Sequence, residues 1–187
     1  MNRRDKLLEW IKQRHKGQLI RRTTEPYINH LIAVAELASI IPLGYETGLC
    51  HDLFEDTETT EAEFLSALIG FGYKNQEAHL ILNCTVELTD VFTKKNYPEL
   101  KKKDRKSREA ARLAAISSTA QTVKYADLIY NIGWVLRYDL KHAVKYLLKK
   151  RLLLAAMTSG EPNLHLKAMN LIDDSLSKLT SKSFTDL

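Results

Sequence analysis

The chain has 187 residues, of which 44% are hydrophobic and 27% are charged. This length and composition fit one ordinary globular domain, large enough to bury a core without disulfide support. The formal net charge is +5. A mild positive excess is compatible with nucleic acid, with an anionic small molecule or with no specific ligand.

Three features of the sequence indicate the compartment. No apolar run approaches the ~20 residues of a membrane span, so we expect no membrane partner. The N-terminus is charged and lacks the apolar segment of a signal peptide behind it. Cys50 and Cys84 have neither CxxC spacing nor the number needed for a disulfide framework. We therefore predict a cytoplasmic protein.

Helical periodicity runs along the whole chain, with few glycines and prolines and little β-branched alternation. Gly17 can end the first helix, and Pro26 suits the first turn of the second. Thr60 and Glu63 have the spacing of a capping box. The expected helices span residues 3–16, 27–41, 45–55, 61–69, 75–87, 101–116, 120–138, 141–157 and 163–179. We predict an all-α bundle, with one domain over residues 1–180 and a polar tail over residues 181–187.

The densest group of titratable side chains ends the third expected helix, in Cys50-His51-Asp52-Leu53-Phe54-Glu55-Asp56. Residues three and four apart share a helix face, so two acidic pairs would project to nearly one side. Like charges this close are costly unless a cation neutralises them. The stretch therefore indicates a metal ion.

Two further residues could complete a metal site. His30 lies in the middle of a largely apolar helix, and Asp127 lies in the mostly apolar stretch 123–131. Taken alone, His30 is more often a core histidine, and Asp127 could cap a helix or form an ion pair. Combined with His51-Asp52, they supply two imidazoles and several carboxylates on separate helices. Such a mixed set suits Mn, Fe, Zn or Mg.

At these residues the sequence resembles the HD-domain phosphohydrolases, and most closely the hydrolase domain of RelA/SpoT enzymes and their small stand-alone relatives. The order of His30, His51-Asp52 and Asp127 resembles the H…HD…D signature. The matching segments, over residues 12–140, are Arg21-Arg22, Pro26-Tyr27-Ile28-Asn29-His30, His51-Asp52-Leu53-Phe54-Glu55-Asp56 with its following threonines, and Lys124-Tyr125-Ala126-Asp127-Leu128-Ile129-Tyr130-Asn131.

The resemblance implies an HD-domain helical bundle with one divalent ion, Mn²⁺ first and Fe²⁺, Zn²⁺, Mg²⁺, Ni²⁺ or Co²⁺ otherwise. It implies a cytoplasmic enzyme of the stringent response that removes pyrophosphate from the 3′ position of guanosine 3′,5′-bispyrophosphate. Such an ion would lower the pKa of a bound water and polarise a phosphoryl oxygen. The implied roles are metal binding by His30, His51, Asp52 and Asp127, action on the attacking water by Glu55 and Asp56, and substrate binding by Arg21, Arg22, Lys124 and Asn131.

Some residues depart from the subgroup's pattern. Leu31 stands where a proline commonly follows the first histidine, and Gly133-Trp134 stand where arginine and threonine are frequent. These departures concern nucleotide recognition and leave the metal ligands intact. Another nucleotide substrate therefore stays open, such as a nucleoside monophosphate, a nucleoside triphosphate or NADPH. A nucleotide-sensing module without turnover is the non-enzymatic alternative.

The stretch 94–112 carries nine Lys and Arg residues. Such a stretch is either a solvated face or an electrostatic lip that attracts a polyanionic nucleotide. Nucleic-acid binding is disfavoured because no reader motif or aromatic interleaving accompanies the charge. Tyr130 and Trp134 could pack in the core or stack on a base. The other histidines, His15 among them, lack neighbouring acidic clusters in the sequence, and we leave them out of the expected site.

Overall fold

The computed structural model describes residues 1–185, and side chains through residue 181. Within this range the chain is helical and has no sheet, apart from an isolated bridge between Leu19 and Pro26. The all-α prediction is confirmed. The helices are α1 (Arg3–Arg14), α2 (Ile28–Ala38), α3 (Gly44–Cys50), α4 (Leu53–Asp56), α5 (Glu61–Phe71), α6 (Asn75–Leu88), α7 (Lys102–Leu113), α8 (Ser118–Tyr138), α9 (Leu140–Ala156) and α10 (Pro162–Thr185).

Local signals explain where several helices begin and end. The predicted capping box at α5 is present, because Thr60 and Glu63 exchange side-chain and backbone hydrogen bonds. Gly17 follows α1 with a φ of 84°, a conformation that glycine adopts without strain. At the other end of the chain, α10 continues to Thr185, beyond the expected end at residue 179. Residues 186–187 of the expected tail lie outside the described residues.

One helix prediction was wrong: residues 45–55 do not form a continuous helix. The chain leaves α3 at His51, and α4 begins at Leu53. The His51 side chain bonds to the Gly48 carbonyl through Nδ1 at 2.7 Å. Asp52 has φ −103° and ψ 7°, outside the helical range. The break gives Asp52 a direction that a regular helix would not, so the shared-face argument for the acidic pairs does not hold.

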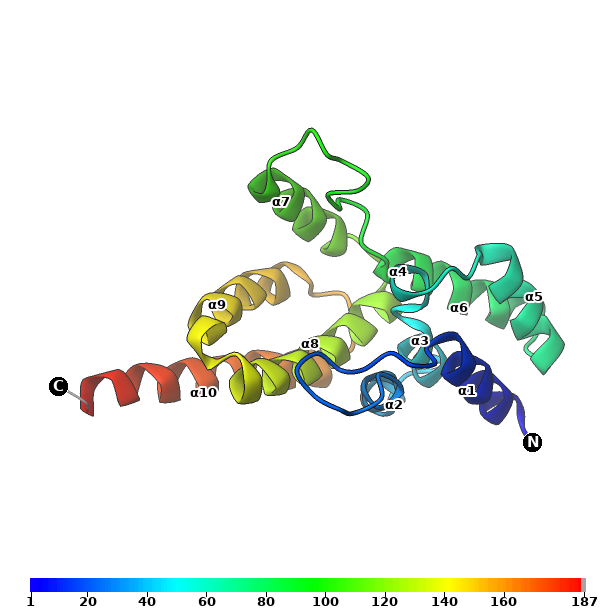
Figure 1. Ribbon diagram of the computed structural model, residues 1–187, viewed down its shortest axis with the longest axis horizontal. Helices are drawn as coiled ribbons and strands as arrows, with labels where there is room; N and C mark the ends of the chain where they lie inside the picture. The colour runs from blue at the N-terminus through cyan, green and yellow to red at the C-terminus, as the bar shows by residue number, and fades with distance from the viewer. Residues whose placement is uncertain (186–187) are drawn as a thin grey trace.

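Two apolar clusters build the core, and α2 contributes to both. One cluster is centred on α8, α9 and α10, and the other is centred on α1, α3, α5 and α6. On α2, Val34 packs in the first cluster and Leu31 packs in the second. Figure 1 shows α2 and α3 beside α8, with α1 and the far end of α10 at opposite ends of the molecule. The polar residues of α2, α3 and α8 therefore meet between two apolar regions.

Gly48 allows α3 to pack closely on α2. A Cβ atom at this position would lie 2.8 Å from the Cα of Ala35, closer than real Cβ atoms approach. A glycine is therefore required where the two backbones meet. This close approach packs α3 along α2 and brings His51, at the end of α3, near His30 in the first turn of α2. None of the helices in residues 1–185 is long and apolar enough to cross a membrane.

Candidate functional site

Three segments bring the predicted metal ligands together. His30 comes from α2, His51 from the end of α3 and Asp127 from α8, and all three are buried. The Nε2 atoms of His30 and His51 lie 3.2 Å apart. The Asp127 Oδ1 atom lies 3.6 Å from His30 Nε2 and 3.7 Å from His51 Nε2. His30, His51 and Asp127 could therefore hold a metal ion.

Asp52 turns its carboxylate toward the same point. Its Oδ2 atom lies 3.0 Å from His51 Nε2 and 3.5 Å from His30 Nε2. The Tyr27 hydroxyl donates a hydrogen bond to this oxygen at 2.5 Å. Tyr27 thus fixes the orientation of Asp52. It lies in the Pro-Tyr-Ile segment of the sequence motif, but the sequence did not indicate this contact.

The donor set fits a divalent cation. His51 Nδ1 donates to the Gly48 carbonyl, so in the neutral ring Nε2 carries the lone pair and faces His30. Two imidazole nitrogens and two carboxylates converge at this point, with the Lys124 ammonium group beside Asp127. Burial opposes protonation of His51, but the carboxylates of Asp52 and Asp127 raise its pKa to about 10. A site that attracts a proton so strongly also attracts a metal ion.

Asp127 is held ionised by two neighbours from its own helix. Lys124 Nζ lies 2.9 Å from Oδ2, and Asn131 Nδ2 donates to Oδ1 at 2.5 Å. Burial disfavours the charged carboxylate, but Lys124 and His51 hold the pKa of Asp127 well below its usual range. Lys124 and Asn131 were predicted to bind substrate. The structure places both beside a candidate ligand and also in the wall of the adjoining cavity.

Glu55 and Asp56, the predicted catalytic pair, lie on α4 next to Asp52. Glu55 Oε1 accepts a hydrogen bond from the Asp90 backbone N–H at 2.7 Å. Desolvation by the surrounding protein, with the charges of Asp90 and Asp52, raises the pKa of Glu55 to about 7. Desolvation and Asp52 also raise the pKa of Asp56. A carboxyl group with a pKa near neutrality, such as that of Glu55, is suited to exchange protons with water.

The segment that carries Asp90 is anchored to α7. Glu109 is buried and accepts the backbone N–H groups of Val91 and Phe92 at 3.1 and 2.8 Å. Arg112 pairs with Glu109 and donates to the Thr89 carbonyl at 3.1 Å. This network fixes the backbone donor that Glu55 uses. Sequence reasoning missed it, because a backbone N–H has no signature in the side-chain pattern.

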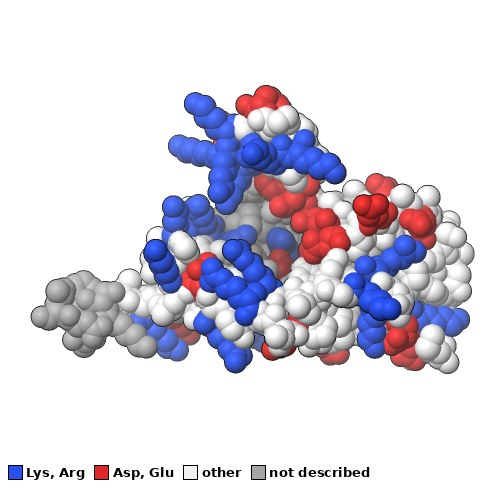
Figure 2. Space-filling model, viewed as in Figure 1, with Lys and Arg blue, Asp and Glu red and all other residues white. Residues whose placement is uncertain are grey.

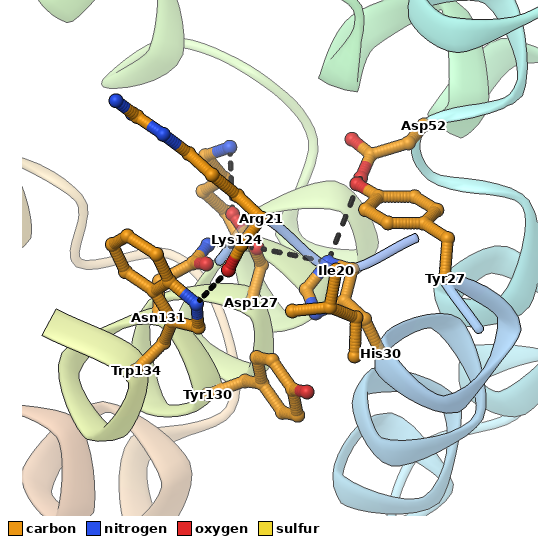
Figure 3. A pocket seen from close by; sticks show the side chains of 10 residues that line it. All are labelled: Ile20, Arg21, Tyr27, His30, Asp52, Lys124, Asp127, Tyr130, Asn131 and Trp134. Atoms are coloured by element: carbon orange, nitrogen blue, oxygen red, sulfur yellow. Dashed lines mark hydrogen bonds and ion pairs between the residues drawn. The ribbon is translucent and has the colours of Figure 1, made fainter. Parts of the chain in front are cut away.

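A cavity of about 300 Å³ opens in front of the ligand residues. This volume matches the lower end of small-molecule sites. The lining residues, drawn in Figure 3, are Ile20, Arg21, Tyr27, His30, Asp52, Lys124, Asp127, Tyr130, Asn131 and Trp134. The cavity therefore combines candidate metal ligands with cationic and aromatic side chains.

The two predicted arginines have different surroundings. Arg21 lines the cavity, and its carbonyl accepts a hydrogen bond from Trp134 Nε1 at 2.9 Å. In Figure 3 its guanidinium extends away from His30 and Asp52. Arg22 donates to the Tyr138 carbonyl and lies 3.3 Å from an Asp139 carboxylate oxygen. Arg22 is not among the lining residues, so its predicted contact with phosphate has no support from this arrangement.

A basic surface lies on one side of the entrance. Figure 2 shows a hollow in this face of the molecule, with Lys and Arg over α7 and α9 and acidic side chains on the opposite wall. Partial burial and the neighbouring charges of Lys149 and Lys102 lower the pKa of Lys106. Burial, together with Lys124, lowers the pKa of Lys150 to about 8. Lysines of α7 and α9 therefore repel one another, and this repulsion favours the binding of an anion between them.

No protein-family model matches the sequence, and no curated protein sequence matches it. Solved structures do match this chain, and one of them is similar over 94% of this chain and 96% of its own, with a TM-score of 0.75 and 19% identity. It is described as a metazoan ortholog of SpoT that hydrolyses ppGpp and plays a role in starvation responses. This chain has a SpoT-type fold. The SpoT-type fold agrees with the all-α bundle and with the resemblance seen in the sequence motifs.

Proposed function

We propose that the protein is a metal-dependent phosphohydrolase of phosphorylated nucleotides, with guanosine 3′,5′-bispyrophosphate as its substrate and pyrophosphate as a product. The observation that carries the proposal is the convergence of His30, His51, Asp52 and Asp127 on one point at the base of a cavity. The SpoT-type fold supports this substrate, because the similar metazoan protein hydrolyses ppGpp. We place the reaction in the cytoplasm and in the stringent response.

The four converging side chains would hold one divalent ion, with Mn²⁺ first among the candidates. When bound, the ion supplies an acidified water and a Lewis acid for a phosphoryl oxygen. Tyr27 holds Asp52 in place, and Lys124 and Asn131 hold Asp127. Supporting contacts of this kind orient the two carboxylates and keep them ionised for metal binding.

Glu55 and Asp56 would receive the proton of the attacking water. Glu55 is poised for this role because its pKa of about 7 leaves it a competent base near neutral pH. The Asp90 backbone N–H fixes one Glu55 oxygen and leaves the other free to face the water. Proton removal at these carboxylates would accompany cleavage of the bond to the pyrophosphate.

The cavity wall would recognise the nucleotide. Arg21 and Lys124 provide positive charge, and Asn131 provides an amide beside the ligand residues. The rings of Tyr130 and Trp134 offer surfaces on which a base can stack. The lysines of α7 and α9 would attract the remaining phosphates, because potentials of one sign steer charged ligands into clefts.

Incubation of the purified protein with Mn²⁺ and guanosine 3′,5′-bispyrophosphate tests the proposal. We expect release of pyrophosphate and guanosine diphosphate, with bound metal detected by mass spectrometry. Asp52→Ala is the matched variant, and it should lose both metal and hydrolysis. No release by a folded, metal-loaded protein would rule out this substrate.

Other nucleotides should be tested as well, because Gly133-Trp134 departs from the subgroup's pattern. Trp134 donates to the carbonyl of Arg21 in the cavity wall, so this departure lies where the substrate would bind. A panel of nucleoside monophosphates, nucleoside triphosphates and NADPH, with detection of phosphate and pyrophosphate, separates these substrates. Binding of a nucleotide by calorimetry without product from any member of the panel would favour a sensing module.

A further inference from the structure

His15 lies at the C-terminal end of α1, and its exposed fraction is 3%. Gly17 makes a turn with a φ of 84°, which returns the chain so that Gln18 faces His15. His15 Nδ1 lies 2.8 Å from Gln18 Oε1. No acidic residue stands near His15 in the sequence, so only the fold brings it close to the candidate site.

The Gln18 side chain connects His15 to the candidate catalytic pair. Gln18 Nε2 donates to the Asp56 backbone carbonyl at 2.7 Å. Only the NH₂ end of the amide can donate, so the Oε1 end must face His15. His15 must then donate through Nδ1–H, which leaves a lone pair on Nε2. The contact to Asp56 thus determines the tautomer of His15.

The His15 ring also supports Tyr27. The two rings stack with their centroids 5.7 Å apart and an angle of 29° between their planes. Tyr27 in turn donates to Asp52 Oδ2. One side chain from α1 therefore acts on both ends of the acidic segment, on Asp52 through a ring contact and on Asp56 through an amide.

We propose that His15 is a positioning residue of the hydrolytic site, an inference that rests on the proposed function. It orients the Gln18 amide that holds Asp56, and it supports the tyrosine that holds Asp52. Its Nε2 atom is buried and has no hydrogen-bond partner among the described residues. A buried lone pair is costly when unpaired, so Nε2 is suited to accept a hydrogen bond from a water at the site.

The charges around His15 agree with a neutral ring. Burial lowers the pKa of His15, and it outweighs the hydrogen bond to Gln18 and the opposing charges of Asp56 and Asp52. The neighbouring His51 acts in the same direction as burial. A neutral imidazole with one donor and one acceptor satisfies the Gln18 amide and leaves the second nitrogen for the site.

His15→Phe and Gln18→Glu test this role. Phenylalanine keeps the ring against Tyr27 and removes both nitrogens. Glutamate keeps an acceptor for His15 and removes the donor to the Asp56 carbonyl. We expect each variant to lower kcat about 10-fold, the lower range for supporting contacts around a metal site, with KM and metal content unchanged. His15→Asn keeps a donor close to the position of Nδ1 and should lose less activity than His15→Phe.

The tautomer provides a readout that does not depend on activity. Nitrogen NMR of the wild-type protein should show His15 protonated on Nδ1 alone, and Gln18→Glu should shift the Asp56 carbonyl resonance. Wild-type kcat in both variants, or protonation of His15 on Nε2, would overturn the proposal. If His15→Phe does not fold, the kcat of Gln18→Glu and the His15 tautomer in the wild-type protein test the proposal instead. If the wild-type protein cleaves no nucleotide, the proposed function fails, whereas the two NMR measurements still test the position of His15.

Discussion

His30 and His51 face each other across the candidate metal site with their Nε2 atoms 3.2 Å apart. In a neutral His51 whose Nδ1 donates to Gly48, Nε2 carries a lone pair, so the close approach of the two rings requires either a proton or a cation between them. Burial opposes the proton, whereas Asp52 and Asp127 favour it and raise the pKa of His51 to about 10. A metal ion must displace this proton.

We therefore expect about one proton to be released for each divalent ion bound at pH 7. Calorimetric titration of Mn²⁺ in buffers with different ionisation enthalpies measures this number. An ion present at 100 times its dissociation constant should raise the free energy of unfolding by about 2.7 kcal/mol. Binding without proton release would contradict a protonated His51 in the metal-free protein.

The metal-free protein should also lose stability as the pH rises. The pKa of His51 is higher in the folded protein than the ordinary histidine value of 6.5. The contribution of protonated His51 to the free energy of unfolding is therefore complete below pH 6.5, and it is lost as the pH rises toward about 10. Urea unfolding of metal-free protein at pH 6, 8 and 9.5 measures the trend, and saturation with Mn²⁺ should reduce it. Equal stability at all three values would count against the assignment.

Asp127→Asn should abolish metal binding and destabilise the fold. The Asp127 and Lys124 side chains are 7% and 16% exposed, so the substitution leaves a largely buried ammonium group without its partner. Loss of one partner of a buried pair costs about 3 kcal/mol. Urea unfolding measures this change. Asp127→Asn combined with Lys124→Met should recover stability without recovering metal, and failure to recover would show that the pair is not the cause.

Glu55→Gln should retain metal and slow hydrolysis about 100-fold, a typical contribution of a general base. Glutamine still offers an oxygen to the Asp90 N–H, so the local structure is kept. The wild-type kcat should rise with pH around a midpoint of about 7, because desolvation and the charges of Asp90 and Asp52 raise the pKa of Glu55 to that value. The variant should lack this rise. Loss of bound metal in Glu55→Gln would instead indicate that Glu55 is a metal ligand.

Trp134→Phe should raise KM for the nucleotide with little change in kcat. The substitution keeps an aromatic ring in the cavity wall but removes the donor to the Arg21 carbonyl. A hydrogen bond is worth about 1 kcal/mol, which corresponds to about a 5-fold change in KM. Trp10→Phe is the matched control: Trp10 of α1 packs on Phe64 of α5 and is not among the residues that line the cavity, so this variant should leave KM unchanged. An equal effect in both variants would remove Arg21 from substrate binding.

The sequence by itself determined the helical class and most helix positions. Periodic apolar residues and local caps, such as Thr60 with Glu63, act within a few residues and leave a readable pattern. It also indicated His30, His51 and Asp127 as a set, because polar groups on apolar helices need a common partner. The structure brings these three together as expected.

Only the tertiary structure decided how the site is oriented. The break at His51-Asp52 follows from a side-chain bond to Gly48 and from the close packing of α3 on α2. The contacts of Tyr27 with Asp52, and of the Asp90 N–H with Glu55, span 25 and 35 positions in the chain. The sequence pattern cannot report such contacts, because they depend on where distant backbones meet.

The same reason explains why the sequence pattern did not indicate His15 as part of the site. His15 has no acidic neighbours in the sequence, but the fold places Gln18 and Tyr27 between it and the acidic segment. A local pattern records which groups are near in the chain, whereas desolvation and hydrogen-bond direction depend on the packed surroundings. The sequence therefore determined which side chains are available as candidate metal ligands. Their geometry, their protonation and their supporting contacts depend on the tertiary structure.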